Sequence, residues 1–277
     1  MSEKYKNAIC FLTKKPNKLF YDFCEKLIGP KYDVYICVDD NTYNLYYLYG
    51  NIINTETHEK MKSSKVKVIR IDNTECENKG FKSTISWMNG RASSRDKSLY
   101  YFCKLNKTEY KNVWFLEEDV FVPSINTISN IDSVYDKCDN NIDLLCHSNY
   151  IIEQQLNELE GWHWDLIKSH IKYDKPPYGV SLSCAVRVSK KLLECINEYV
   201  DKNNNLFFCE VLFNTIALQN NLTVVTPIEL STILYGKIWK NEDDFNKNYL
   251  YHPVKDIKQQ YSFRELIYKR NQNVSFT

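Results

Sequence analysis

The chain has 277 residues and an almost balanced charge, with 36 Lys and Arg against 35 Asp and Glu and a formal net charge of +1. A nucleic-acid-binding protein normally concentrates a basic excess on one face, so this balance argues against that class of partner. Hydrophobic residues make up 43% of the chain, which excludes a disordered protein. No apolar run approaches the roughly 18 residues that span a bilayer, and the first residues lack the apolar stretch of a signal peptide. We therefore expect a cytoplasmic protein with no membrane span.

Apolar, β-branched segments alternate with amphipathic ones along the chain. Strands are predicted, in chain order, over residues 7–13, 33–38, 67–71 and 112–116, near 143–146 and near 182–188. Helices are predicted over residues 17–28, from Ser93 or Ser94 to about Leu105, after Pro123, near 189–200 and near 207–219. Strands separated by helices indicate βαβ units, and so an α/β fold with a mainly parallel sheet covered on both faces. The polar stretch 237–277 shows little periodicity, and we expect it to wrap over the surface or to close a site.

Ten cysteines are present, but no two of them form a CxxC pair, the spacing typical of zinc and redox motifs. Most of them lie inside apolar runs. The favoured interpretation is therefore free thiols within the core of a protein made in a reducing compartment.

Three adjacent acids, Glu117, Glu118 and Asp119, follow the apolar segment 112–116 directly. Adjacent carboxylates repel one another unless a cation neutralises them, and hard oxygen ligands suit Mg²⁺ or Mn²⁺. A solvated turn is the alternative, although this segment uses no Gly or Asn. An ion held by one or two carboxylates keeps open positions, which the diphosphate of a nucleotide sugar can fill.

Asp39 follows the segment 33–38, and we expect it near the same edge as these acids. Ligands of mainly parallel sheets bind beyond the carboxyl ends of the strands, where polar side chains can reach a base or ribose. An Asx turn leading into Asn41 is an equally good interpretation of this pair of acids, Asp39 and Asp40.

The segments SRDKSLYYF (94–102) and YKNVWFLEEDVFVP (110–123) resemble the nucleotide-binding half of GT-A fold glycosyltransferases. The arrangement is closest to inverting N-acetylglucosaminyltransferase-like enzymes, whose Glu-Asp-Asp motif becomes Glu-Glu-Asp here. The resemblance implies a Rossmann-like GT-A sheet in which Asp119 binds Mn²⁺ or Mg²⁺. It also implies a UDP-linked nucleotide sugar as the donor. The residues that would position this donor are Asp39, Arg95, Asp96, Glu117 and Glu118. The sequence contains no internal repeat and no low-complexity linker, which indicates a single domain. We expect a donor half over residues 1–140, an acceptor half over 141–240 and a tail over 241–277 that closes the site.

Transfer of a sugar to a hydroxyl acceptor with inversion requires a base that takes the acceptor's proton. In the resembling enzymes this acid opens a helix of the acceptor half, and Glu210 in the segment FFCEVLF fits that position. A Glu between Phe208 and Val211 is costly to bury without a purpose or a partner. The alternatives are an exposed Glu210 on the polar face of a helix, and Glu229 as the base.

Further site residues rest on the same resemblance. Many GT-A enzymes bring a late His to the metal and a basic residue to the diphosphate, which suggests His252 for the metal and Lys255 for the phosphates. Gly179 and Ser181 resemble the small residues beneath the sugar. Trp162 and His163 are candidates for stacking on an acceptor sugar, although core packing is the plainer interpretation.

The leading hypothesis is therefore a metal-dependent, inverting glycosyltransferase for a nucleotide-sugar donor and a glycan or other hydroxyl acceptor. A sugar nucleotidyltransferase is the nearest alternative, but it normally carries a Gly-rich loop after the first strand, and residues 11–17 contain no Gly. A non-catalytic carbohydrate-binding scaffold is the other alternative, for which the Glu-for-Asp change at Glu118 is the hint.

Overall fold

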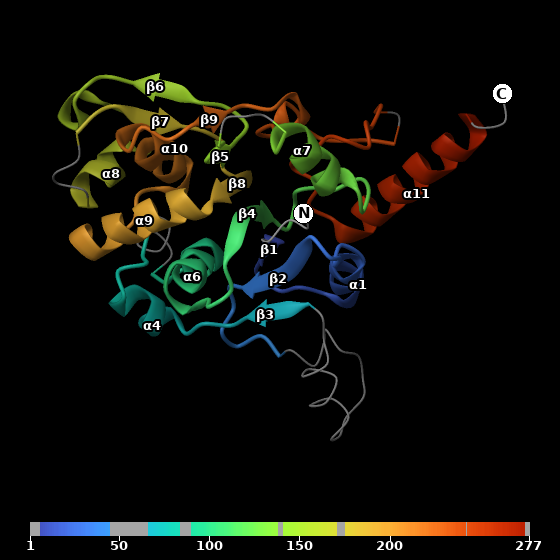
Figure 1. Cartoon of the computed structure of the whole chain (residues 1–277), viewed down its shortest axis with the longest axis horizontal. Helices are drawn as coiled ribbons and strands as arrows, with labels where there is room; N and C mark the ends of the chain where they lie inside the picture. Colours follow the sequence, from blue (N-terminus) through green and yellow to red (C-terminus); the bar gives the residue numbers. More distant parts are fainter. Residues whose placement is uncertain are drawn as a thin grey trace.

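A mainly parallel sheet lies at the centre of the computed structural model, which describes residues 6–44, 66–83, 90–137, 141–170, 175–241 and 243–274. In these residues the sheet has seven strands in the order β3-β2-β1-β4-β8-β5-β9 (Figure 1). Their bounds are β1 (Lys6–Thr13), β2 (Tyr32–Val38), β3 (Lys67–Ile69), β4 (Tyr110–Glu117), β5 (Leu144–Leu145), β8 (Ala185–Ser189) and β9 (Val224–Val225). Among them β8 alone runs antiparallel to its neighbours, β4 and β5.

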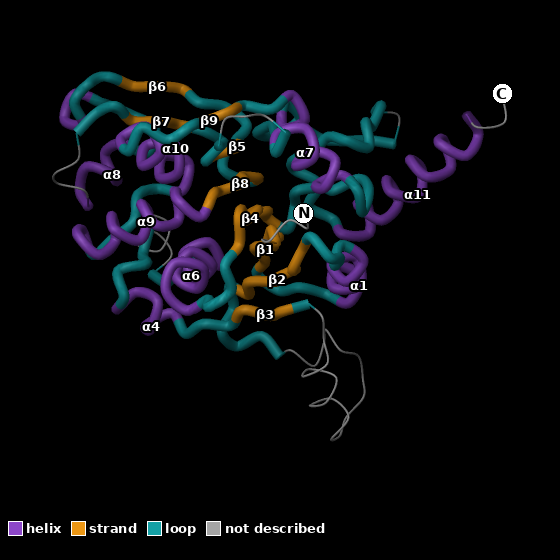
Figure 2. The backbone as a smooth tube through the Cα atoms, in the orientation of Figure 1, coloured by secondary structure: helices purple, strands orange, loops and turns teal. Residues whose placement is uncertain are grey.

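Helices cover both faces of this sheet (Figures 1 and 2). One face carries α4 (Asn73–Asn78), α6 (Ser94–Tyr100), α9 (Lys190–Asn203) and α10 (Cys209–Gln219), and the other carries α1 (Lys18–Lys26) and α7 (Thr127–Tyr135). This Rossmann-like arrangement confirms the predicted fold class.

Smaller elements complete the chain. A second, two-stranded antiparallel sheet pairs β6 (Tyr150–Ile152) with β7 (Tyr178–Val180) in the described residues. The remaining elements are α8 (Trp164–His170), α11 (Ile257–Val274), the π-helical turn η1 (Tyr101–Leu105) and the 3₁₀ turns η2 (Leu156–Glu158) and η3 (Ile228–Leu230).

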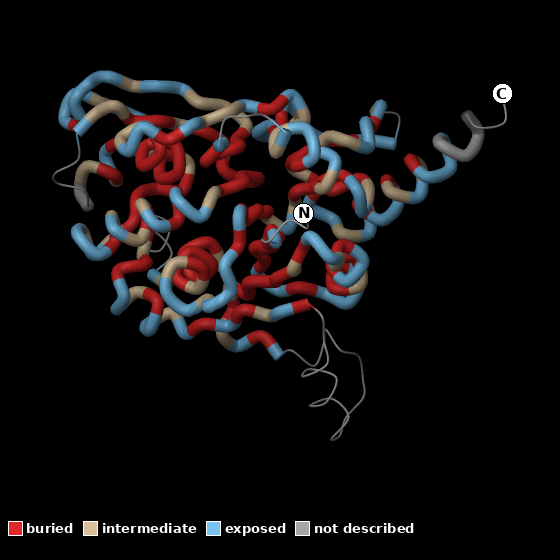
Figure 3. The backbone as a smooth tube through the Cα atoms, viewed as in Figure 1, coloured by how far each residue is buried: buried red, intermediate tan, exposed pale blue. Residues whose placement is uncertain are grey.

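The apolar run of β1 explains why both faces need cover. Successive side chains of a strand point to opposite faces. Ala8 and Cys10 accordingly pack in the cluster under α6, α9 and α10, whereas Ile9 and Phe11 pack in the cluster under α1 and α7. The inner strands of the sheet are buried along most of their length, whereas the edge strands β3 and β9 are partly exposed (Figure 3).

A buried carboxylate joins α7 to the sheet. The carboxylate of Asp132 accepts hydrogen bonds from Tyr32 Oη at 2.6 Å, Arg187 Nη1 at 2.9 Å, Asn7 Nδ2 at 3.0 Å and Trp114 Nε1 at 3.1 Å. Four donors satisfy this carboxylate, so its burial at 3% exposure leaves no unpaired charge. The network fixes α7 across four strands.

The predicted elements agree with the observed ones to within a few residues, but the sequence did not predict α4, α8, β6, β7 and β9. β3 ends at Ile69 rather than at residue 71, and the polar tail contains α11, a helix that the weak periodicity did not predict. α11 packs through few apolar side chains, with Phe263 and Ile267 among them, and extends away from the body in Figure 1. The nine described cysteines are free thiols, as expected, and Cys138 lies outside the described residues. Of the described helices, none combines the length and the apolarity that crossing a membrane requires.

Candidate active site

A pocket of about 370 Å³ lies at the carboxyl ends of β1, β2 and β4. Because these strands are parallel, their ends meet at one edge, where the loops that follow them face a common space. The lining contains six of the residues that the sequence suggested, together with Leu12, Lys14, Ser93 and Ser94: Asp39, Arg95, Glu117, Glu118, Asp119 and Lys255. The structure therefore brings together residues that are more than two hundred positions apart in the sequence.

Arg95 is the most buried charged group of the pocket, with 5% of its surface exposed. Its Nη2 donates to Glu117 Oε1 and to the carbonyl of Ser183, both at 2.8 Å. Its Nη1 is buried, and no described residue accepts a hydrogen bond from it. Arg95 thus holds Glu117 in place and keeps one donor unused.

The sequence left open whether Asp39 and Asp40 bind a ligand or form an Asx turn, and the structure shows a different environment for each. The carboxylate of Asp40 forms the Asx turn, accepting from the backbone N–H of Thr42 at 2.8 Å. Asp39 instead has a buried Oδ1 with no partner among the described residues, and its carbonyl accepts from Lys97 Nζ at 2.6 Å. Burial raises the pKa of Asp39, against the nearby cations Arg91 and Lys97. An unpaired acceptor in the pocket is suited to a ligand that offers a hydrogen-bond donor.

Glu118 and Asp96 have protein partners of their own. The hydroxyl of Thr13 donates to the Glu118 carboxylate, which ties the acidic segment to the end of β1. Asp96 is 1% exposed, closes the capping box of α6 with Ser93 and accepts from the backbone N–H of Ser83. Asp96 does not line the pocket, and the structure does not bring it to the other candidate residues.

The C-terminal tail contacts the acidic edge of the pocket, formed by Glu117, Glu118 and Asp119, through backbone hydrogen bonds in and just after this segment. Phe121 and Tyr251 exchange hydrogen bonds of 2.7 and 3.1 Å, and the N–H of Val254 donates to the carbonyl of Asp119 at 2.8 Å. His252 is thereby placed with its Nε2 3.5 Å from Asp119 Oδ2. Burial acts to lower the pKa of His252, but Asp119, the carbonyl of Leu234 and Glu117 together raise it above its ordinary value.

Cys184 is a neighbour of this edge that the sequence did not suggest. Glu117, Cys184 and His252 each offer one potential ligand atom, and these atoms lie within 4.8 Å of one another. The donor set of carboxylate oxygens, an imidazole nitrogen and a sulfur fits a divalent metal ion. Burial raises the pKa of the Cys184 thiol, with Glu117 adding to the effect.

Glu210 lies in the first turn of α10, where two charged residues of the pocket, Glu117 and Arg95, and the nearby His252 act on it. Its pKa is raised, by burial first and then by Glu117, while Arg95 and His252 act in the opposite direction. Glu229, the alternative base, accepts a hydrogen bond of 2.8 Å from the hydroxyl of Tyr135. Neither acid lines the pocket, but Glu117 and Arg95, which do, act on Glu210, and this makes Glu210 the better candidate.

The aromatic residues before α8 pack against the residue that precedes α10. Phe208 lies 4.6 Å from His163 and 5.5 Å from Trp162 between ring centroids. Trp162 remains 49% exposed, and its φ of 42° is a left-handed conformation that bulky residues rarely adopt. The exposed indole of Trp162 is thus held against Phe208, which lies two positions before Glu210 in the chain.

Gly179 and Ser181 do not open a space for substrate. A Cβ on Gly179 would lie 2.5 Å from the Cβ of Asn214, so this glycine permits the close packing of β7 on α10. Ser181 is 2% exposed, and its hydroxyl accepts from the backbone N–H of Ser148. Both residues serve packing, which corrects the expectation that they let a sugar approach.

The sequence missed two further cations at this edge as well. Lys14 lines the pocket directly after β1, where the rule of polar residues after strands could have found it. Lys97 is fully buried, with its Nζ 2.5 Å from Asn41 Oδ1. Residues two apart on a helix point in nearly opposite directions, so the position of Lys97 relative to Arg95 carried no signal that it reaches the loop after β2.

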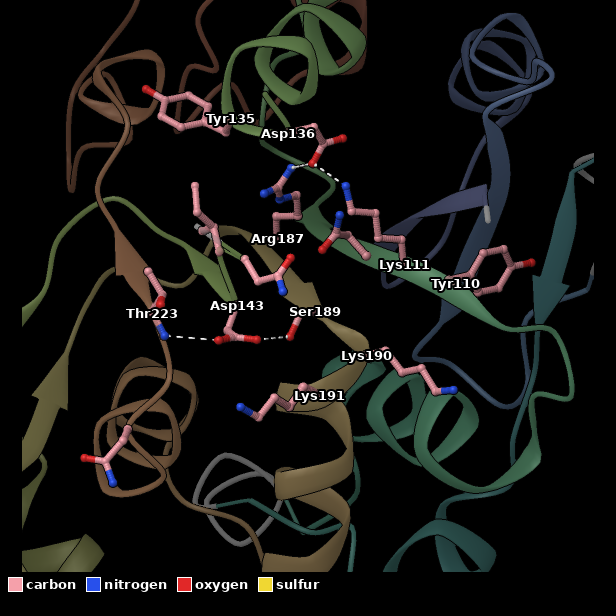
Figure 4. Close-up of a pocket in the computed structure, with 14 residues that line it drawn as sticks. Tyr110, Lys111, Tyr135, Asp136, Asp143, Arg187, Ser189, Lys190, Lys191 and Thr223 are labelled. Atoms are coloured by element: carbon pink, nitrogen blue, oxygen red, sulfur yellow. Dashed lines mark hydrogen bonds and ion pairs between the residues drawn. The ribbon is translucent and has the colours of Figure 1, made fainter. Parts of the chain in front are cut away.

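A second pocket, of about 610 Å³, lies at the other end of β4 (Figure 4). Several of its charged groups are paired with one another. Asp136 contacts Arg187 at 3.0 Å and Lys111 at 3.3 Å, while Asp143 accepts from Ser189 Oγ at 2.8 Å. These pairs join β8 to α7 and to the start of β5, so we assign them to the fold rather than to chemistry.

No protein-family model matches the chain, and no curated protein sequence matches it. Among solved structures, it is similar to glucosyl-3-phosphoglycerate synthase from Mycobacterium tuberculosis in complex with Mn²⁺, UDP-glucose and phosphoglyceric acid. That match has 10% identity and a TM-score of 0.37, and covers 95% of this chain and 77% of the synthase. It is also similar to 4-diphosphocytidyl-2C-methyl-D-erythritol synthase from Anaerococcus prevotii, with 9% identity, a TM-score of 0.36 and coverage of 80% and 87%. Neither similarity is high enough to transfer an activity to this chain.

Proposed function

We propose that the protein is a metal-dependent glycosyltransferase that transfers a sugar from a UDP-linked donor to a hydroxyl acceptor with inversion. The observation that carries the proposal is the pocket at the carboxyl ends of β1, β2 and β4. There an acidic edge, unused hydrogen-bonding groups and two lysines surround one space, and Glu210 lies beside it. This combination matches the needs of a nucleotide diphosphate and of a proton acceptor.

The donor half of the site has groups suited to each part of a nucleotide diphosphate. The unpaired Oδ1 of Asp39 would accept a hydrogen bond from the base or the ribose. The exposed side chains of Lys14 and Lys255 would neutralise phosphate oxygens from two sides of the pocket. The roles of Glu117 and Glu118 would be to hold Arg95 and the end of β1 in place around the nucleotide.

Asp119 and His252 would hold Mn²⁺ or Mg²⁺, because their side chains face each other at 3.5 Å at the acidic edge. A divalent ion bound there would stabilise the negative charge of the diphosphate as it leaves. The cation would also relieve the repulsion among the three adjacent carboxylates.

In the acceptor half, the Glu210 carboxylate would take the proton of the acceptor hydroxyl as that oxygen attacks the sugar. Burial beside Glu117 makes Glu210 a stronger base than an exposed Glu, since its raised pKa favours holding a proton. Trp162 and His163 would offer aromatic faces to the C–H surface of an acceptor sugar.

The test is isothermal titration calorimetry with UDP in the presence and absence of Mn²⁺, followed by a screen of nucleotide sugars for hydrolysis or transfer. We expect UDP binding that requires the metal, and release of UDP from at least one sugar donor. Release of inorganic diphosphate from UTP and a sugar phosphate would instead identify a nucleotidyltransferase. No metal-dependent nucleotide binding would identify a non-catalytic scaffold.

A further inference from the structure

The thiol of Cys184 lies beside Glu117 and His252, and its position depends on the antiparallel direction of β8. Because β8 runs antiparallel to β4, the residue that precedes it lies where β4 ends. The backbone N–H of Glu117 donates to the carbonyl of Cys184 at 2.9 Å and fixes this neighbourhood. The Cys184 side chain then lies with those of Glu117 and His252, their ligand atoms all within 4.8 Å. Metal bonds of about 2.0 to 2.3 Å at the tetrahedral angle place two ligands of one ion about 3.3 to 3.8 Å apart, so the three side chains need to close by at most about 1.5 Å to bind a common ion.

The hydrogen bonding of His252 presents a lone pair to this cluster. Its Nδ1 lies 2.8 Å from the carbonyl oxygen of Leu234, which can only accept a hydrogen bond. Nδ1 therefore carries a hydrogen in the charged and in the neutral ring, and in the neutral ring Nε2, which lies against Asp119, has the lone pair that a metal would bind. The 3.5 Å between Nε2 and Asp119 Oδ2 is close to the separation of two ligands on one tetrahedral ion, about 3.4 Å for bonds of about 2.1 Å.

We propose that Cys184 is a ligand of the metal in this site, together with His252 and the carboxylates, and that the site selects a transition metal ion over Mg²⁺. This inference rests on the proposed function only for the role of the metal in donor binding. Sulfur and imidazole nitrogen favour Zn²⁺, Co²⁺ and similar ions, whereas Mg²⁺ prefers oxygen ligands alone. On binding, the thiol loses its proton to the solvent, a sulfur–metal bond forms, and no electron is transferred.

The experiment is a spectroscopic titration of the full chain with Co²⁺, without nucleotide. A thiolate ligand gives Co²⁺ an intense charge-transfer band in the near ultraviolet, beside the weaker visible bands of the ion. We expect this band in the wild type and its loss in Cys184→Ser, with the visible bands retained. Cys209→Ser is the matched control, because Cys209 is 7% exposed against 8% for Cys184 but lies outside the ligand cluster.

Zn²⁺ affinity provides a second measure. Loss of a group that only orients a ligand costs about 10- to 100-fold in metal affinity, so loss of a direct ligand should cost at least as much. In the wild type, Zn²⁺ but not Mg²⁺ should also displace Co²⁺ and remove the charge-transfer band. This measurement needs no variant and holds even if Cys184→Ser fails to fold.

Visible Co²⁺ bands without the charge-transfer band, a band that survives in Cys184→Ser, or no Co²⁺ binding would each overturn the proposal. UDP binding with Mn²⁺ is measured separately. If UDP binding persists while the thiolate band is missing, the inference about Cys184 fails and the proposed function stands. If the band is present but UDP does not bind, the metal site stands and the proposed function fails.

Discussion

Replacement of Glu210 by Gln tests the proposed chemistry most directly. Gln has the same shape and can still hydrogen-bond an acceptor hydroxyl, but it cannot take the proton. A positioned general base contributes about 10²- to 10⁴-fold, which corresponds to about 3 to 5 kcal/mol of activation free energy. We therefore expect kcat to fall by two to four orders of magnitude while the affinity for UDP stays within about twofold, because Glu210 does not line the donor pocket.

The charges around Glu210 add a dependence on pH. Burial and Glu117 raise its pKa above the ordinary 4.5, against Arg95 and His252. The carboxylate is the active form, so kcat/KM should fall as pH drops through that raised value. A raised pKa in the folded state also means that Glu210 contributes most to stability below pH 4.5, and that this contribution is lost as pH rises through the folded pKa. Without metal, Glu210→Gln should melt at a higher temperature than the wild type at neutral pH, and the difference should close in acid.

The assay is steady-state transfer from the donor that the nucleotide-sugar screen identifies, with calorimetry for UDP and thermal melts in EDTA. Glu229→Gln is the control, since Glu229 bonds to Tyr135 away from the pocket, and its kcat should not change. Near-normal turnover by Glu210→Gln would refute the assignment. Loss of turnover in Glu229→Gln alone would move the base to that residue.

Three other substitutions test the metal site and the fold. Asp119→Ala should abolish the metal dependence of UDP binding in calorimetry with little change in the melting temperature, because the contact that it removes is a partly exposed pair with His252 at 3.5 Å. Asp132→Ala should lower the free energy of unfolding, measured in urea, by about 3 to 5 kcal/mol. The change removes one of the carboxylates that contact Arg187 and leaves three neutral donors, on Asn7, Tyr32 and Trp114, without their acceptor. Gly179→Ala should cost about 1 to 3 kcal/mol in the same experiment, because its Cβ would meet Asn214 at 2.5 Å; a neutral effect would show that α10 shifts freely.

Much of the candidate site could be predicted because it follows from parallel strands. A buried apolar run followed by acids indicates both a central strand and the edge at which it ends, which located Asp39 and the segment 117–119. The order of strands then brought these residues to one pocket. The sequence could not show which polar or small residues have a structural role in the fold and which are available to a ligand. Asp96 and Gly179 have the residue types expected of a site, but the cap of α6 and the packing of α10 account for both.

Cys184 escaped prediction for a topological reason. The rule that ligands meet residues after strands holds for parallel strands, and the antiparallel β8 inverts it, so that the residue before the strand faces the site. The residues around Cys184 do not indicate that β8 is antiparallel, because the pattern of apolar residues in a buried strand is the same for either strand direction. The pairing with β4 that sets the direction is made across almost seventy positions of sequence, between Leu116 and Ala185.

The same limit applies to the tail, where the site depends on contacts that are not periodic. Two isolated bridges, Phe121 with Tyr251 and Ile233 with His252, hold the tail beside the acids. Backbone hydrogen bonds of this kind carry no side-chain signature, so His252 could be suggested by resemblance but not placed. Once placed, it is joined to Asp119 through Val254 as well as through its own ring. The proposed metal ligands and the anchoring of the tail therefore form one structural unit, and any perturbation that releases the tail from Phe121 should also displace His252 from Asp119.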